Sequence, residues 1–234
     1  MLSVLTLGFL LGLRHALEAD HVAAVASLVS KSGTTKNTMR LGAIWGFGHT
    51  LALFLFSLIF MLTDSVLPDR LAMGLEFVVG IMLVLLGADV IRRLIKDKVH
   101  FHTHQHGNNQ THFHAHKHVG EKNHDDSKHD HEHHANFSLR ALYIGLMHGM
   151  AGSAALIILT LQSVDSLMTG ISYILVFGVG SMVGMAALSA VIALPFRQSA
   201  KGLNRVHNGL QAVIGSITIV IGGFVIFQSS VFLV

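Results

Sequence analysis

Residues 2–29 read LSVLTLGFLLGLRHALEADHVAAVASLV, in which two apolar stretches enclose the polar run Arg14-His15-Ala16-Leu17-Glu18-Ala19-Asp20-His21. A bilayer core about 30 Å thick needs roughly 20 apolar residues per helix, and this segment is long enough. An ionisable side chain that faces lipid at mid-membrane depth costs on the order of 2.5 to 3.5 kcal/mol. The segment therefore predicts a transmembrane helix whose polar side chains face the interior of a helix bundle.

The remainder of the chain has the composition of a membrane protein. Its 234 residues are 51% hydrophobic and 12% charged, with a mean hydropathy of +0.58. Cysteine is absent, which excludes disulfides and thiolate metal sites. Apolar segments of membrane-spanning length cover residues 2–29, 41–62, 71–91, 139–161, 168–194 and 210–234. We predict an all-α integral membrane protein of six transmembrane helices.

The positions of the basic residues predict the orientation of these helices. Apart from Arg14 and Arg70, every Lys and Arg follows the first, third or fifth apolar segment. Loops rich in Lys and Arg remain in the cytoplasm. We therefore expect residues 96–136 to be cytoplasmic, in the cell membrane, and both termini to be extracytoplasmic. The basic pI of about 9.4 arises from these loops, and no soluble basic domain remains to bind nucleic acid.

The two halves of the chain resemble each other in three places. The matching pairs are Gly12-Leu13-Arg14-His15 with Gly145-Leu146-Met147-His148, Gly46-Phe47-Gly48-His49 with Gly178-Val179-Gly180-Ser181, and Leu75-Glu76, Gly80 and Gly87 with Leu210-Gln211, Gly215 and Gly222. Because each half has three spans, the halves must cross the membrane in opposite senses. We predict a 3+3 inverted repeat, residues 1–95 and 137–234, with binding near the bilayer midplane between the repeats.

His15, Asp20 and His21 are the strongest candidates for metal ligands. Two imidazoles and a carboxylate suit divalent nickel, cobalt, zinc or copper, whereas magnesium and calcium prefer oxygen ligands. On a continuous helix Asp20 points away from the two histidines. A site that uses all three requires the helix to bend or unwind there, as discontinuous transporter helices do. The alternative interpretation is a buried polar network that only fixes helix packing.

His49 and His148 are further candidate ligands. Each lies inside an apolar segment, each is flanked by Gly, and both fall in the matching parts of the two halves. Glycine allows close approach of neighbouring helices. We expect both histidines to be ligands or to line the ion pathway, although a lone intramembrane histidine often serves only packing.

Other polar residues of the apolar segments support the path less directly. Arg14 and Glu18 are four residues apart, so we expect them to pair with each other. Glu76 and its repeat counterpart Gln211 line the path or lie near enough to the segment ends to reach water. His207 falls in a basic loop, where we expect it to be solvated.

The tract of residues 96–136 contains most of the 18 histidines and almost no apolar residues. We expect it to be disordered without metal and to act as a metal buffer or sensor, because neutral imidazoles bind transition metals with little discrimination. Its candidate ligands are His100, His102, His104, His106, His112, His114, His116, His118, His129, His131, His133 and His134.

The motif from Gly12 to His21 resembles the first-helix signature of the nickel/cobalt transporter family (NiCoT, within the broader NicO group), which has the form His, four residues, Asp-His. Gly48-His49-Thr50 resembles the second-helix motif of that family. The resemblance implies that His15, Asp20, His21 and His49 recognise the metal. Many importers of the family have eight spans, and a long cytoplasmic His-rich loop is closer to its efflux branch. The residues of the first motif, Arg14-His15-Ala16 and Ala19-Asp20-His21, are closer to those of the importers.

The sequence as a whole favours secondary transport of nickel or cobalt as substrate, with uptake preferred and efflux as an alternative. It contains no Gly-x4-Gly-Lys-Ser/Thr motif for nucleotide binding and no His-Glu-x-x-His motif of a metalloenzyme, so we expect neither an enzyme nor a prosthetic group. A partner that delivers metal or couples energy, such as a metallochaperone, is compatible with this interpretation. A membrane metal sensor or storage protein that works through the His-rich loop is the other alternative.

Overall fold

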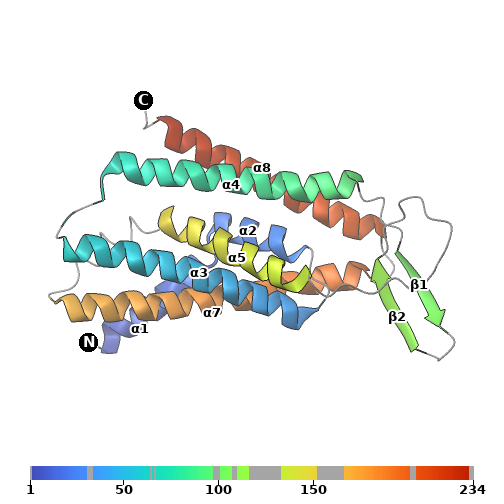
Figure 1. Ribbon diagram of the computed structural model, residues 1–234, viewed down its shortest axis with the longest axis horizontal. Helices are drawn as coiled ribbons and strands as arrows, with labels where there is room; N and C mark the ends of the chain where they lie inside the picture. The colour runs from blue at the N-terminus through green and yellow to red at the C-terminus, as the bar shows by residue number, and fades with distance from the viewer. Residues whose placement is uncertain are drawn as a thin grey trace.

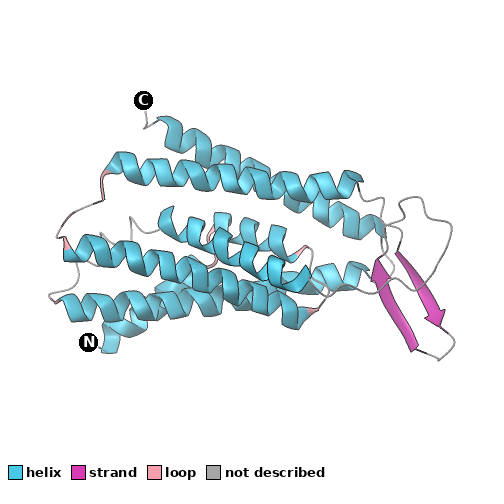
Figure 2. Cartoon of the chain, in the orientation of Figure 1, coloured by secondary structure: helices cyan, strands magenta, loops and turns pink. Residues whose placement is uncertain are grey.

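The computed structural model describes residues 2–30, 34–63, 65, 67–96, 101–106, 110–115, 133–151, 166–200 and 204–231. These residues form seven helices and a two-stranded antiparallel hairpin (Figures 1 and 2). The elements are α1 (Leu2–His15), α2 (Ala19–Val29), α3 (Thr35–Leu62), α4 (Asp69–Lys96), β1 (Phe101–His106), β2 (Gln110–Ala115), α5 (His133–Ala151), α7 (Leu167–Ala200) and α8 (Asn204–Val231).

Four of the described helices, α3, α4, α7 and α8, are long and apolar enough to cross a membrane. The helices α1 and α2 are shorter but also apolar. At 1.5 Å per residue they are about 21 Å and about 17 Å long, so together they match a bilayer core that neither spans alone. The protein is a multi-pass membrane protein. Six spans remain a prediction, because the predicted fourth span, 139–161, continues into residues outside the described ranges.

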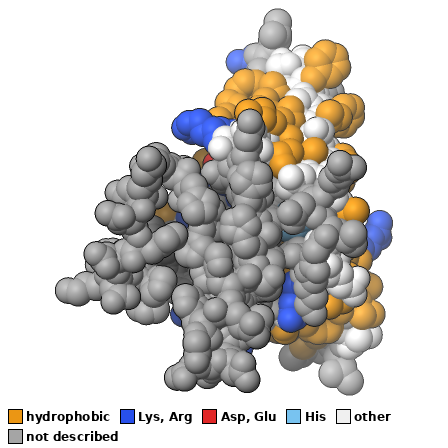
Figure 3. Space-filling model, turned by 90° about the vertical axis from the view of Figure 1, so that its right-hand side faces the viewer, with side chains coloured by type: hydrophobic (Ala, Val, Ile, Leu, Met, Phe, Trp, Pro, Cys, Tyr) orange, Lys and Arg blue, Asp and Glu red, His pale blue; other side chains and the backbone are white. Residues whose placement is uncertain are grey.

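The outer faces of the long helices are apolar and exposed. On α8 the exposed side chains follow a helical stripe, with Val213, Ile217, Val220, Phe224 and Phe227 all at least half exposed. Figure 3 views the molecule from the end that carries the hairpin and shows hydrophobic side chains gathered along its flank. A stripe of this length on a soluble monomer would be unfavourable, whereas lipid solvates it.

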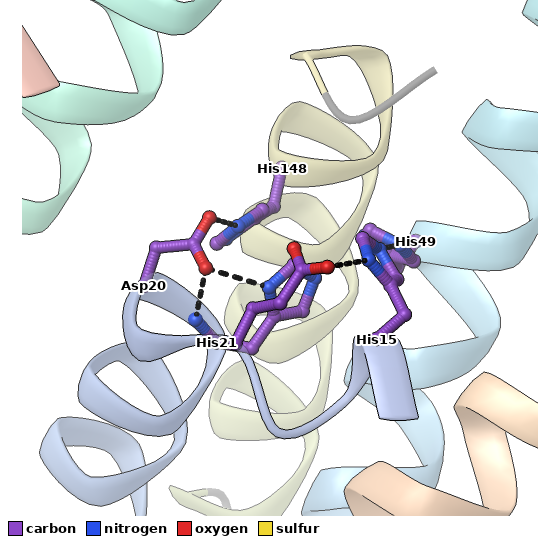
Figure 4. Close-up of polar contacts among 6 residues, drawn as sticks. His15, Asp20, His21, His49 and His148 are labelled. Carbon is purple, nitrogen blue, oxygen red and sulfur yellow. Dashed lines mark hydrogen bonds and ion pairs between the residues drawn. The ribbon is translucent and has the colours of Figure 1, made fainter. Parts of the chain in front are cut away.

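The helices are arranged around α2, whose residues from Ala23 to Val29 are all buried. It contacts α3, α4, α7 and α8, and Asp20 in its first turn bonds to His148 of α5 (Figure 4). A helix that is buried on all sides must be apolar all round and small enough for close packing, and the run Ala23-Ala24-Val25-Ala26 meets both conditions. The two chain ends lie at the end of the bundle opposite the hairpin.

Glycine contacts between helices recur in the two halves. A Cβ at Gly12 of α1 would meet the Phe177 carbonyl oxygen of α7 at 2.1 Å, and a Cβ at Gly145 of α5 would meet the Trp45 carbonyl oxygen of α3 at 2.1 Å. Gly12 and Gly145 are matching positions of the two halves, as are Trp45 and Phe177. Packing of α1 on α7 therefore repeats the packing of α5 on α3.

The third helices of the two halves, α4 and α8, also pack through equivalent glycine contacts. Gly80 of α4 packs on the Gly222 carbonyl of α8, and Gly87 of α4 packs on the Gly215 carbonyl. Since Gly80 matches Gly215 and Gly87 matches Gly222, the two contacts exchange when the halves are exchanged. The close pairs α3 with α7 and α4 with α8 join matching helices in the same way.

The hairpin lies within the His-rich tract for which we expected disorder. Its register pairs His102 with His114 and His104 with His112. The helix α5 also begins inside the tract, at His133. The residues of the tract numbered 97–100, 107–109 and 116–132, which include candidate ligands His100, His116, His118, His129 and His131, lie outside the described ranges.

Candidate metal centre

The first apolar segment is two helices rather than one, and the interruption lies within the polar run. The amides of Leu17 and Glu18 donate to the carbonyls of Arg14 and His15 at 2.9 and 3.1 Å, which closes tight turns in place of the regular helical pattern. Glu18 then takes an extended conformation (φ −64°, ψ 148°) as the residue before α2. The bend that a shared site requires is therefore present, without a proline.

Asp20 occupies the first turn of α2, where backbone amides have no helical partner. Its Oδ1 accepts from the backbone N–H of His21 at 2.8 Å and from the Nδ1–H of the same residue at 2.9 Å. Its Oδ2 accepts from the Nε2–H of His148 on α5 at 2.9 Å. A carboxylate at a helix N-terminus is favoured by the helix dipole. Asp20 thus joins α2 to α5 and sets the orientation of two imidazoles.

His15 connects the end of α1 to α3. Its Nδ1–H donates to Glu18 Oε1 at 3.0 Å, and its Nε2 lies 3.2 Å from His49 Nε2. Because a carboxylate only accepts, His15 carries its proton on Nδ1, and His49 Nε2–H is the donor to His15. Glu18 is about half exposed, whereas His49 is fully buried.

Five side chains from three places in the chain converge here: His15, Asp20, His21, His49 and His148 (Figure 4). One nitrogen of each fully buried imidazole has no hydrogen-bond partner, namely Nε2 of His21 and Nδ1 of His49 and His148. The bonds to the carboxylates and to His15 place the protons on the opposite nitrogens, so these three atoms present lone pairs. A buried unpaired polar atom is costly, and a bound cation that takes its lone pair removes that cost. The three nitrogens do not form one ligand group, since His49 and His148 belong to different groups that share His21.

The spacing of these groups suits a transition-metal ion. Ligand atoms of His15, His21 and His49 lie within 4.8 Å of one another, as do those of Asp20, His21 and His148. Two nitrogens that bind one ion at about 2.05 Å in tetrahedral geometry are roughly 3.3 Å apart. The Nε2 atoms of His15 and His49 lie 3.2 Å apart, close to that value, so an ion bound by both would replace the hydrogen bond between them, with the proton of His49 moved to Nδ1. Asp20, whose oxygen holds the Nδ1–H of His21, is the kind of carboxylate partner that metal-binding histidines have.

Aromatic rings close the site on two sides. The Trp45 ring is fully buried and lies 5.6 Å from the rings of both His21 and His148. The Phe177 ring lies 5.4 Å from His15. Sequence reasoning missed both residues, although Trp45 stands four residues before His49, one helical turn away, and Phe177 is its counterpart in the other half. The spacing of one helical turn from His49 could have identified Trp45 as a neighbour of the site.

Four residues were expected to support the ion path: Arg14, Glu18, Glu76 and Gln211. None of them belongs to the metal-ligand groups of the described residues. Arg14 is exposed at the end of α1, and Glu18 pairs with His15 rather than with Arg14. Glu76 is half-buried on α4, next to Ser229 of α8.

Gln211 and His207 form a separate network. Gln211 contacts His207 Nε2 at 3.1 Å, and His207 Nδ1 contacts Ser199 Oγ at 3.1 Å. The expectation that His207 is solvated was wrong, since its side chain is buried on α8, which begins earlier than the apolar segment indicated. Neither residue belongs to the metal-ligand groups found in the described part of the chain.

Comparison with known proteins identifies relatives. The urease accessory protein UreH of Bacillus sp. (strain TB-90) is 36% identical over 222 residues, which cover 95% of this chain and 90% of the relative. The chloroplast proteins FOR GROWTH AND FERTILITY 2 and 1 of Arabidopsis thaliana are 27% and 25% identical over 192 and 191 residues. The chain spans about half the length of these two plant proteins.

Neither a family model nor a solved structure matches the chain. The sequence identity to UreH is nevertheless high enough to show a common family, and the similarity extends over nearly the whole of both proteins. The chain is a member of the family of the urease accessory protein UreH.

Proposed function

We propose that this protein carries divalent nickel, with cobalt as the second ion, into the cytoplasm across the cell membrane. The observation that supports this most directly is the convergence of four histidines and Asp20 at a helix break, deep in an apolar bundle, with three buried imidazole nitrogens unpaired. Ionisable groups inside membrane segments mark ion pathways by default. The metal is therefore the substrate, and His15, Asp20, His21, His49 and His148 bind it in transit.

Two arguments support nickel: the ligand chemistry restricts the ion to a borderline transition metal, and the family favours nickel among these. Imidazole with carboxylate suits borderline ions such as nickel and cobalt. The related protein is an accessory protein of urease, an enzyme that requires nickel, so nickel supply is the simplest role that a membrane protein of this family can have. Uptake is the preferred direction because the membrane potential drives a divalent cation inward.

The architecture that we propose is the 3+3 inverted repeat of residues 1–95 and 137–234, joined by the His-rich tract 96–136. Equivalent glycine contacts in the two halves and the pairing of matching helices support it. With the basic loops in the cytoplasm, both termini are outside, at the end of the bundle opposite the hairpin. The cytoplasmic tract then meets ions as they leave the site and buffers them.

The membrane potential is a sufficient driving force for entry. Moving two charges through about 100 mV is worth roughly 4.6 kcal/mol in the inward direction. Secondary transport in which the two repeats rock around the site requires no nucleotide, and the protein acts as a transporter rather than an enzyme.

Metal flux into sealed proteoliposomes of known orientation tests this proposal. The full chain should take up nickel and cobalt saturably, faster than zinc or manganese, and His21→Ala should abolish the flux. His207→Gln changes a buried histidine outside the cluster and is the matched control, which should retain flux.

Three results would contradict the proposal in different ways. Outward flux driven by protons would make the protein an exporter. Unchanged flux in His21→Ala would remove the cluster from the pathway. Absence of flux, together with tight metal binding that is lost when residues 99–135 are deleted, would make the protein a sensor or storage protein.

A further inference from the structure

The five residues of the central cluster divide into two overlapping ligand groups. His15, His21 and His49 form one, and Asp20, His21 and His148 form the other. The first offers three nitrogens, and the second offers two nitrogens and a carboxylate oxygen. Only His21 belongs to both groups, and its side chain is 1% exposed.

His21 has one nitrogen available for a metal. Its Nδ1–H is held by Asp20 Oδ1 at 2.9 Å, and its Nε2 has no partner. One imidazole lone pair binds one ion, and two divalent cations at such short range also repel each other strongly. The two groups therefore serve one ion in turn rather than two ions together.

The flanking histidines are equivalent positions of the two halves. His15 and His148 end the matching sequences that begin at Gly12 and Gly145. Their ring centroids lie 4.4 and 4.2 Å from that of His21, on α1 and α5 respectively.

The ring contacts of the flanking histidines are equivalent as well. His15 packs on Phe177 at 5.4 Å, and His148 packs on Trp45 at 5.6 Å, where the two aromatic residues also match between the halves. His21 thus lies between two similarly built histidine positions, one from each half.

We propose that the cluster holds two successive positions for the transported ion, and that the ion passes from one to the other while it remains bound to His21. The inference rests on the proposed transport function. In an inverted repeat the two halves exchange conformations as access alternates. A histidine of one half then approaches His21 as its counterpart in the other half withdraws, so the ion is never left without protein ligands in the apolar interior.

The two positions differ in chemistry. The Asp20 group includes a carboxylate ligand that is about one-third exposed, whereas the His15 group offers imidazoles alone and is nearly all buried. Cobalt distinguishes them, because its visible absorption depends on the number and type of ligands. The chain has one tryptophan, Trp45, beside the cluster, so quenching of its fluorescence reports an ion there rather than in the His-rich tract.

The test uses the full chain and cobalt, with His21→Ala as the background for absorption and for quenching. His15→Ala should retain His21-dependent cobalt binding through Asp20 and His148. His148→Ala should retain it through His15 and His49. The absorption bands of the two variants should differ, binding should weaken less than about ten-fold in each, and flux in proteoliposomes should fall more than ten-fold. The His15→Ala/His148→Ala double variant should lose binding.

A second pair of variants guards against misfolding. Asp20→Asn should reproduce the absorption of His148→Ala, and His49→Ala should reproduce that of His15→Ala. If His15→Ala loses cobalt binding as completely as His21→Ala does, the proposal is overturned. The cluster would then be a single ion site, in which Asp20 orients histidines but does not bind the ion. Wild-type flux in His148→Ala would overturn it as well. Distinct cobalt spectra in His15→Ala and His148→Ala, together with no flux in the wild type, would refute the transport function but still support two ion positions.

Discussion

Gly145 of α5 lies against the backbone of α3, and its replacement by alanine tests whether helix packing holds His148 in the site. A Cβ at Gly145 would lie 2.1 Å from the Trp45 carbonyl oxygen and 3.0 Å from the His49 nitrogen. Ordinary contact begins at 3.4 Å, so the helices must separate by about 1.3 Å (3.4 − 2.1). The obstructing atoms are backbone, which no side-chain rotation can relieve.

This displacement reaches the site directly. His148 is three residues from Gly145, on the same face of α5. Its hydrogen bond to Asp20 is 2.9 Å long, and metal–ligand distances tolerate only about 0.2 Å. Separation of α5 from α3 misplaces His148 of one ligand group and His49 of the other, so we expect nickel binding to weaken about 10- to 100-fold, more than on loss of His148 alone. Overpacking should also lower the free energy of unfolding by about 1 to 3 kcal/mol.

Nickel titration followed by Trp45 fluorescence and thermal unfolding in detergent measure the two effects. Gly74→Ala is the matched control, because a Cβ there meets nothing within 4 Å, and it should bind normally and gain up to about 1 kcal/mol from helix propensity. Gly12→Ala, the equivalent change in the other half, should destabilise as Gly145→Ala does. Equal stability and affinity in Gly145→Ala and Gly74→Ala would refute the reasoning.

Three further changes test the packing and the membrane face. Ser27→Ala leaves Thr218 without its 3.0 Å hydroxyl partner across α2 and α8, and thermal unfolding should show a loss of about 1 kcal/mol; no loss would mean that the pair adds nothing. Phe224→Asp places a charge on the exposed stripe of α8 and should cost roughly 3 kcal/mol of insertion, seen as reduced membrane-inserted protein, whereas normal insertion would place this face in water. Asp89→Asn removes the ion pairs to Arg140 at 3.2 Å and to Arg93 at 3.5 Å. Because all three groups are partly exposed, the loss should be about 1 kcal/mol or less and should shrink in high salt; a larger, salt-independent loss would contradict this.

The long helices could be located from the sequence, but their ends could not. Hydropathy predicted the apolar centres of α3, α4, α7 and α8, because lipid contact requires long apolar runs. It missed the polar ends. The helix α3 begins at Thr35 rather than near residue 41, since Thr34 accepts from the Asn37 amide at its start. The helix α7 continues past Pro195 to Ala200, beyond the predicted end at residue 194.

The members of the candidate site could be predicted because ionisable residues are rare inside apolar segments. His15, Asp20, His21, His49 and His148 all meet in the structure. Their pairing could not be predicted, since it depends on how α1, α3 and α5 pack. Spacing along a helix suggested that Arg14 pairs with Glu18, but the helix ends at His15, and the break turns Glu18 toward His15 instead.

The break itself follows from the polar run. On a continuous helix successive side chains point about 100° apart, so His15, Asp20 and His21 could not face one centre. A carboxylate left facing lipid costs on the order of 2.5 to 3.5 kcal/mol. Breaking the helix frees backbone groups that lipid cannot satisfy, and at this break the amides of Leu17, Glu18 and His21 all have partners. The chain therefore bends at the polar run without a proline, and the same bend brings Asp20 and His21 to the histidines of α1, α3 and α5 (Figure 4).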